Sequence, residues 1–154
     1  RHLRAGNQLT TLLTLMRMWD QPEMQEHVGY MRGPFQEKLK EPAYMRGFTT
    51  RALPRSEHPE LLVADYWEQI GAFVKYGLFD ERSWLDVACN QIEAAWEALE
   101  PAIMAMRVAG GSAVFENFEY IAVRAQLWIR AHPDGYYPKR TPRMAQLKAG
   151  LRST

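Results

Sequence analysis

The sequence lacks most of the features that assign a protein to a functional class. It has one cysteine in 154 residues, Cys89, so no disulfide can form within the chain, which fits a reducing compartment. It has no Asn-x-Ser/Thr acceptor site, no secretory signal and no apolar run long enough to cross a membrane. The net charge is only +1, so overall charge gives no reason to expect a nucleic acid, a membrane surface or an acidic substrate as partner.

Catalytic and cofactor motifs are also missing. The chain has no Gly-x-Ser-x-Gly nucleophile turn, no phosphate-binding Gly-x-x-x-x-Gly-Lys-Ser/Thr and no Gly-x-Gly-x-x-Gly. A carboxylate-bridged metal site needs Glu-x-x-His on two helices, whereas this chain offers only Glu23 and His27, four residues apart. We therefore predict no catalytic residue, no metal site and no cofactor, and the sequence favours a non-enzymatic protein.

What the sequence does contain is helical periodicity. Hydrophobic residues make up 47% of the chain and charged residues 24%, a composition typical of a globular domain. The spacing predicts helices over residues 5–19, 22–31, 59–76, 81–110 and 114–131, with a short helix at 35–40 and one helical turn at 144–147. Asp20 and Asp80 are the expected N-caps of the second and the longest helix, and Gly77 and Gly110-Gly111 are expected to end helices.

Two apolar stripes define the predicted core. The first occupies the helix that starts at Pro59 and comprises Val63, Trp67, Ile70 and Val74. The second, which we call the seam, repeats at spacings of four and three in the longest helix and comprises Leu85, Cys89, Ile92, Trp96, Leu99, Ile103 and Met106. Cys89 is therefore expected to be a small hydrophobic residue, shielded from thiol reagents until the protein unfolds.

These patterns predict an all-α fold, an antiparallel bundle of four to five helices that occupies residues 1–135. Pro101 removes one backbone hydrogen bond from the long helix, so we expect a kink there. Residues 136–154 form a separate basic tail that contains Pro and Tyr.

The tail supplies one set of candidate binding residues. From Arg130 onward the chain has six basic residues and one acidic residue, a net +5, which leaves −4 on residues 1–129. Cations interleaved with aromatic rings are typical of nucleic-acid and phosphate binders. The candidates are Tyr136, Tyr137, Lys139, Arg140 and Arg143. The sequence nevertheless favours a solvated tail, or a tail draped over the acidic bundle.

A second set consists of Glu68, Arg107 and Glu119, each beside an apolar stripe on a different predicted helix. Arginine is the natural bidentate partner of a partly buried carboxylate, so Arg107 is expected to pair with Glu68 or with Glu119. The group is either a polar binding pocket or an ion pair that fixes the register of the helices. The sequence favours the ion pair.

Four motifs carry a resemblance to a known family: Tyr66-Trp67-Glu68, Gly77-Leu78-Phe79-Asp80, Trp96…Pro101…Arg107 and Phe115-Glu116-Asn117-Phe118-Glu119-Tyr120. Over roughly residues 7–129 the chain resembles an uncharacterised family of bacterial helical domains, with Trp67 where Phe is commoner. Many members resemble membrane-tethered proteins, so the resemblance implies a cytoplasmic domain that a transmembrane segment upstream of Arg1 holds at the inner membrane. The family brings no assigned activity.

Two functional hypotheses follow. The first is a non-enzymatic interaction or regulatory module that binds a protein partner or assembles into a homo-oligomer, because large apolar and aromatic side chains are in excess. The alternative is a binder of an anionic ligand, a nucleic acid or a membrane surface that acts through the basic tail. Binding through the tail would weaken steeply with salt, whereas a buried apolar interface would barely respond.

Overall fold

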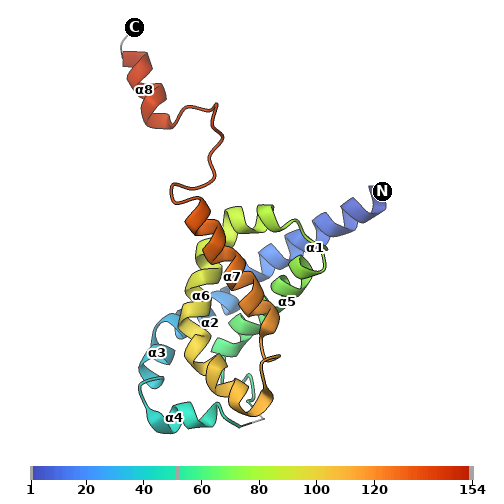
Figure 1. Cartoon of the computed structure of the whole chain (residues 1–154), viewed down its shortest axis with the longest axis vertical. Coiled ribbons are helices and arrows are strands. Elements are labelled where there is room, and N and C mark those ends of the chain that lie inside the picture. The colour runs from blue at the N-terminus through green and yellow to red at the C-terminus, as the bar shows by residue number, and fades with distance from the viewer. Residues whose placement is uncertain (1, 51–52, 153–154) are drawn as a thin grey trace.

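Helices supply the regular structure of this protein. A computed structural model describes residues 2–50 and 53–152, with side chains described for 10–50 and 53–149. The helices, in chain order, are α1 (His2–Asp20), α2 (Pro22–Arg32), α3 (Pro34–Lys38), α4 (Pro42–Gly47), α5 (Glu60–Lys75), α6 (Glu81–Gly110), α7 (Glu116–Ala131) and α8 (Met144–Arg152) (Figure 1). No strand occurs within residues 2–50 and 53–152, and the predicted all-α fold is confirmed.

Local signals set the ends of the longest helices. The Asp80 carboxylate accepts a hydrogen bond from the Ser83 backbone N–H at 2.9 Å and caps α6, as predicted. Gly77 (φ 67°) lies in the turn after α5, and Gly111 (φ 79°) follows α6. Both glycines adopt a left-handed conformation that costs other residues more, so the predicted helix ends are confirmed.

The cap predicted for the second helix is wrong. Asp20 is the last residue of α1, and the N-cap position of α2 is Gln21, whose side chain makes no capping hydrogen bond. Pro22 at the first helical position starts α2 without such a cap, because its backbone has no N–H to satisfy. Pro42 does the same for α4, a helix that the sequence pattern does not predict.

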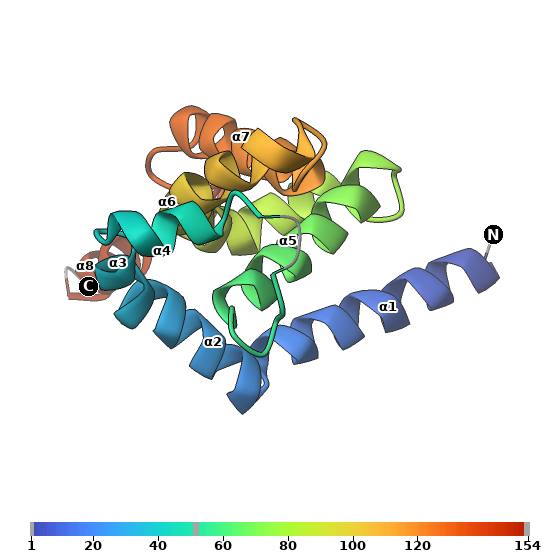
Figure 2. The same ribbon diagram turned by 90° about the horizontal axis from the view of Figure 1, so that it is seen from below.

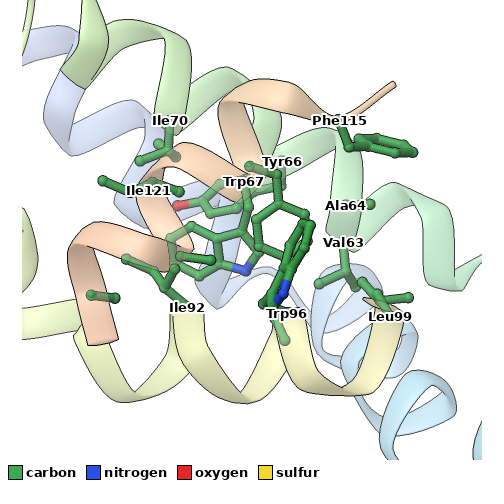
Figure 3. Packing of buried hydrophobic residues seen from close by; sticks show 14 of the residues in the cluster. Val63, Ala64, Tyr66, Trp67, Ile70, Ile92, Trp96, Leu99, Phe115 and Ile121 are labelled. Atoms are coloured by element: carbon green, nitrogen blue, oxygen red, sulfur yellow. The ribbon is translucent and has the colours of Figure 1, made fainter. Parts of the chain in front are cut away.

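The core lies where α5, α6 and α7 meet. All four residues of the predicted α5 stripe are buried, and Figure 3 shows side chains of the three helices gathered around Trp67. Trp96 of α6 meets the edge of the Phe118 ring of α7 with centroids 5.1 Å apart, a geometry that aromatic quadrupoles favour. Leu85, Ile92, Leu99 and Ile103 of the seam are likewise buried.

The two remaining seam residues, Cys89 and Met106, are only partly buried. The expectation that Cys89 is fully shielded is therefore wrong, because its helical position falls at the edge of the buried face. Burial still raises the pKa of the Cys89 thiol, so less thiolate is present near neutral pH. We expect the native protein to react with a disulfide reagent several-fold more slowly than the same protein in guanidinium chloride. Equal rates would mean that this face of α6 is not packed.

Helices α6 and α7 run antiparallel. The end of α6 is tied to the start of α7 by Arg107 and Glu119, and the start of α6 is tied to the middle of α7 by Glu81 and Arg124. Helix α6 continues through Pro101 from Glu81 to Gly110, and the kink there remains a prediction.

Two helices extend from this packed centre. The N-terminal part of α1 projects beyond the bundle in both views (Figures 1 and 2). Helix α8 stands apart from the bundle at the end of an extended segment (Figure 1), and its six described side chains, residues 144–149, are all exposed. It is also longer than the single turn predicted at 144–147.

Candidate functional site

The arginine of the predicted polar group pairs with only one of its two candidate carboxylates. Arg107 Nη2 lies 2.8 Å from Glu119 Oε2, and Arg107 Nε donates to the Val114 carbonyl at 3.0 Å. The Arg107 side chain is 14% exposed and that of Glu119 41%. Arg107 therefore ties the last turn of α6 to the connecting loop and to α7.

Glu68 does not pair with Arg107: it lies on α5 and caps the N-terminus of α7. Phe115, at the N-cap position of α7, adopts a left-handed φ of 53° and makes no side-chain capping bond. In its place, Glu68 Oε1 accepts from Asn117 Nδ2 at 2.7 Å and Oε2 accepts from the Phe118 N–H at 2.8 Å. A carboxylate at a helix N-terminus satisfies a free donor and matches the positive end of the helix dipole.

A close helix crossing completes this arrangement. Gly71 lies one turn after Glu68, and a Cβ atom added to it would be 2.0 Å from the Asn117 carbonyl oxygen. Lys75, one turn further, donates to the Asn117 side chain and pairs with Glu116. The face of α5 that carries Glu68 is thus fitted to the first turn of α7. This geometry supports a structural role for Glu68, Arg107 and Glu119.

The first residues of the tail are fastened to the bundle. Arg82 Nη2 donates to the Tyr136 hydroxyl at 2.7 Å, and the Tyr136 ring lies 5.6 Å from Trp128 and 5.2 Å from His132. One face of the predicted stacking residue Tyr136 is consequently occupied by the end of α7.

The next tail residues fold on themselves. The Arg143 guanidinium lies 3.9 Å from the Tyr137 ring centroid, and Arg143 Nη2 donates to the Asp134 carbonyl. The Tyr137 hydroxyl donates to the Pro142 carbonyl at 3.3 Å. Lys139 and Arg140 are exposed and form no ion pair or side-chain hydrogen bond within the described part of the chain. The tail candidates therefore divide into a brace (Tyr136, Tyr137 and Arg143) and two unpaired cations.

The brace carries α8. Met144 and Leu147 of this helix are 62% and 47% exposed, beside Arg143 and Lys148. The Arg143 backbone N–H donates to Gln146 Oε1 at 2.8 Å, which caps the helix start. The result is a short amphipathic helix with an uncovered apolar face.

A charged residue that the sequence pattern does not predict to be buried is Glu60. It is fully buried, with Oε1 2.8 Å from His58 Nδ1 and with no hydrogen-bond partner for Oε2 among the described residues. The Tyr44 hydroxyl is buried without a partner as well, and its pKa is raised by burial and by the negative charge of Glu60. One signal could have found Glu60: it precedes Val63 by three residues, in register with the buried α5 stripe. We infer that Tyr44, His58 and Glu60 together anchor α4 against the start of α5.

Two cavities flank α1. A cavity of about 410 Å³ lies between α1, α2 and α5 and is lined mainly by apolar atoms, including those of Met18, Met24, Leu62 and Tyr66. A second, of about 180 Å³, lies between α1, α5 and α6 and is lined by three indole rings. In the latter, the indole nitrogens of Trp67 and Trp84 are buried with no hydrogen-bond partner in the described residues.

The described residues form neither a metal-binding cluster nor a membrane-spanning helix. Over 2–50 and 53–152, no group of three or more His, Cys, Asp or Glu side chains could hold a metal ion. None of the helices in these ranges is long and apolar enough to span a membrane.

The fold and these contacts define an all-α protein in which Glu68, Arg107 and Glu119 connect neighbouring helices. Residues 9–125 match the family model described as a domain of unknown function, DUF4760, and the chain belongs to this family. Glu68, Arg107 and Glu119 lie inside the matched range, whereas the tail candidates lie beyond it. No curated protein and no solved structure matches the chain.

Proposed function

We propose that this domain is a non-enzymatic interaction or regulatory module that associates with a second copy of itself. The observation that carries the proposal is the presentation of α8, whose apolar Met144 and Leu147 stand uncovered at the end of a braced segment. An isolated helix of nine residues gains little stability in water from its own hydrogen bonds, so a packing surface would stabilise it. The bundle is acidic and the tail is basic. The bundle of a second copy therefore offers the tail a surface of opposite charge.

The surface around α1 supports an interaction role independently of the tail. Leu13, Met16 and Met18 are each more than two-fifths exposed; Met18 lines the 410 Å³ cavity and Met16 lines the 180 Å³ cavity. Exposed apolar side chains gathered next to a cavity are typical of surfaces that bind another protein. A second protein partner could use this surface while the tail is engaged elsewhere.

Sedimentation velocity of the full chain tests self-association. We expect concentration-dependent association of the wild type and a marked loss when Met144→Asp and Leu147→Asp are combined, since both changes charge the exposed apolar face of α8. The matched control is Val123→Asp with Leu127→Asp on α7, where both residues are 49% exposed. A wild type that stays monomeric at high concentration would refute self-association.

A second candidate function is anion binding through the tail, favoured by the unpaired and exposed Lys139 and Arg140. The ligand would be an anionic small molecule, a nucleic acid or a membrane surface. We expect heparin, used as a polyanion probe, to bind weakly and with steep salt dependence, and to be lost when Lys139, Arg140 and Arg143 become Ala. Tight binding that persists at high salt would show that the tail is not a simple electrostatic arm.

The resemblance to bacterial, membrane-tethered proteins supports one more element of the proposal, a cytoplasmic location at the inner membrane. Fractionation of cells that express the complete gene product tests it. Recovery of the protein outside the membrane fraction would speak against a tether.

A further inference from the structure

The outward face of α6 carries a row of carboxylates that we call the acidic ridge: Asp86, Glu93, Glu97 and Glu100. Spacings of seven, four and three residues place them on one side of the helix, opposite the buried Ala88, Ala95 and Ala102. No residue of the ridge forms an ion pair or side-chain hydrogen bond within residues 10–50 and 53–149. At about 1.5 Å per residue, the row is roughly 21 Å long.

Nearby cations are engaged elsewhere. Lys75 pairs with Glu116, Arg107 with Glu119 and Arg124 with Glu81. Arg82, one turn before Asp86, donates to the Tyr136 hydroxyl. The same face of α6 continues into two exposed apolar residues, Met104 and Val108. The α6 face is therefore acidic along most of its length and apolar at its C-terminal end.

The tail has the complementary composition. Lys139, Arg140 and Lys148 are exposed cations without a described partner, and Met144 and Leu147 form an exposed apolar face between them. Nine residues of α8 span about 13 Å, and the segment from residue 139 adds length at its N-terminal side. The tail and the α6 face are thus similar in length and opposite in charge, and each has an apolar portion.

Within the described residues, the tail cations Lys139, Arg140 and Lys148 form no ion pair or side-chain hydrogen bond with the acidic ridge of their own chain. Tyr136 is held by Arg82, and Arg143 is held by Tyr137 and Asp134, so the segment leads α8 away from the bundle (Figure 1). A second copy can meet α8 in that position without breaking the brace.

We propose that the basic tail of one copy docks on the acidic ridge of α6 in a second copy, and that two copies exchange tails reciprocally. The proposal rests on the proposed self-association and names its two surfaces. A reciprocal exchange uses the same pair of surfaces twice and closes into a twofold dimer. Such a contact depends on charge, so it weakens as salt screens it.

Charge reversal provides the test, with two variants of the full chain. In the tail variant, Lys139→Glu, Arg140→Glu and Lys148→Glu leave Arg143 and the brace intact. In the ridge variant, Glu93→Lys, Glu97→Lys and Glu100→Lys make α6 basic. We expect each variant alone to associate at least ~10-fold more weakly than the wild type, because attractive pairs become repulsive.

Mixing the two variants is the decisive step. In a mixed pair, the acidic tail of one chain meets the basic ridge of the other and the basic tail meets the acidic ridge, so we expect a heterodimer of about wild-type affinity. The control is Glu26→Lys, Glu41→Lys and Glu57→Lys, which makes the same change in charge at exposed sites off the ridge and is expected to associate as the wild type does. Circular dichroism of each variant checks that it is folded.

Each outcome bears on a different part of the proposal. A ridge variant that associates as the wild type does, or variants that fail to pair when mixed, would overturn docking of the tail on the ridge. If the tail variant alone loses association, self-association through the tail stands and the ridge is the wrong surface. A wild type that is monomeric throughout refutes both.

Discussion

Gly71→Ala is expected to lower the free energy of unfolding by about 3 kcal/mol, at the upper end of the usual cost of overpacking. The added Cβ would lie 2.0 Å from the carbonyl oxygen and 2.6 Å from the carbonyl carbon of Asn117, both backbone atoms. Relief requires α5 and α7 to separate. That movement also stretches the hydrogen bonds that Asn117 and Phe118 donate to Glu68, which lies one turn away from Gly71.

Thermal denaturation measures this effect, and a second glycine provides the control. For a chain of this length we expect the melting temperature of Gly71→Ala to fall by roughly 6–12 °C. Gly29 lies within α2, where an added Cβ meets nothing within 4 Å. Gly29→Ala should instead gain about 0.5–1 kcal/mol, because alanine favours the helix. If both variants shifted alike, the close α5–α7 crossing would be wrong.

The two glycines also illustrate what could be predicted from the sequence. Apolar stripes and helix ends depend on neighbours in the chain, and these predictions were confirmed for Trp67 and Ile70 and for the Asp80 cap. Nothing in the sequence distinguishes Gly71 from Gly29. Their difference arises from the approach of α7, which is almost fifty residues away in the chain.

The same reasoning explains the polar residues. The sequence placed Glu68 near Arg107 as one of two candidate partners, but Glu68 binds the start of α7, where the left-handed Phe115 leaves the helix without its own cap. Glu60 was missed because its burial depends on Tyr44 and His58, which pack against it from α4 and the preceding loop. The sequence pattern predicts no helix at α4, although proline at a first helical position starts helices, as Pro42 does here.

The tail shows how structure changes the interpretation of a composition. Two tyrosines among cations predicted stacking platforms, yet Tyr136 and Tyr137 hold Arg82 and Arg143 within the protein. The cations left free are those that point outward from the brace and from α8. Charge available for a partner is therefore smaller than the net +5 of this region suggests, and it is concentrated beside an apolar face.

The pair Arg107–Glu119 gives the second large expected effect. Arg107→Met should lower the free energy of unfolding by about 2 kcal/mol, because it removes a charge-assisted bond to Glu119 and leaves the Val114 carbonyl without its donor. Partial exposure of Glu119 lets water compensate for part of the loss, which keeps the cost below that of a fully buried pair. Arg143→Met, whose exposed contacts are with Tyr137 and the Asp134 carbonyl, should leave the unfolding free energy of the bundle almost unchanged.

A double-mutant cycle then separates the two carboxylates. Arg107→Met with Glu119→Gln should cost about 1 kcal/mol less than the sum of the single changes, because the two side chains share one interaction. Arg107→Met with Glu68→Gln should be additive within ~0.5 kcal/mol, since Arg107 and Glu68 share no hydrogen-bond partner. Equal coupling to both carboxylates would mean that they act as one network. If Arg107→Met left stability unchanged and abolished self-association, the group would be a binding site and its structural assignment would be wrong.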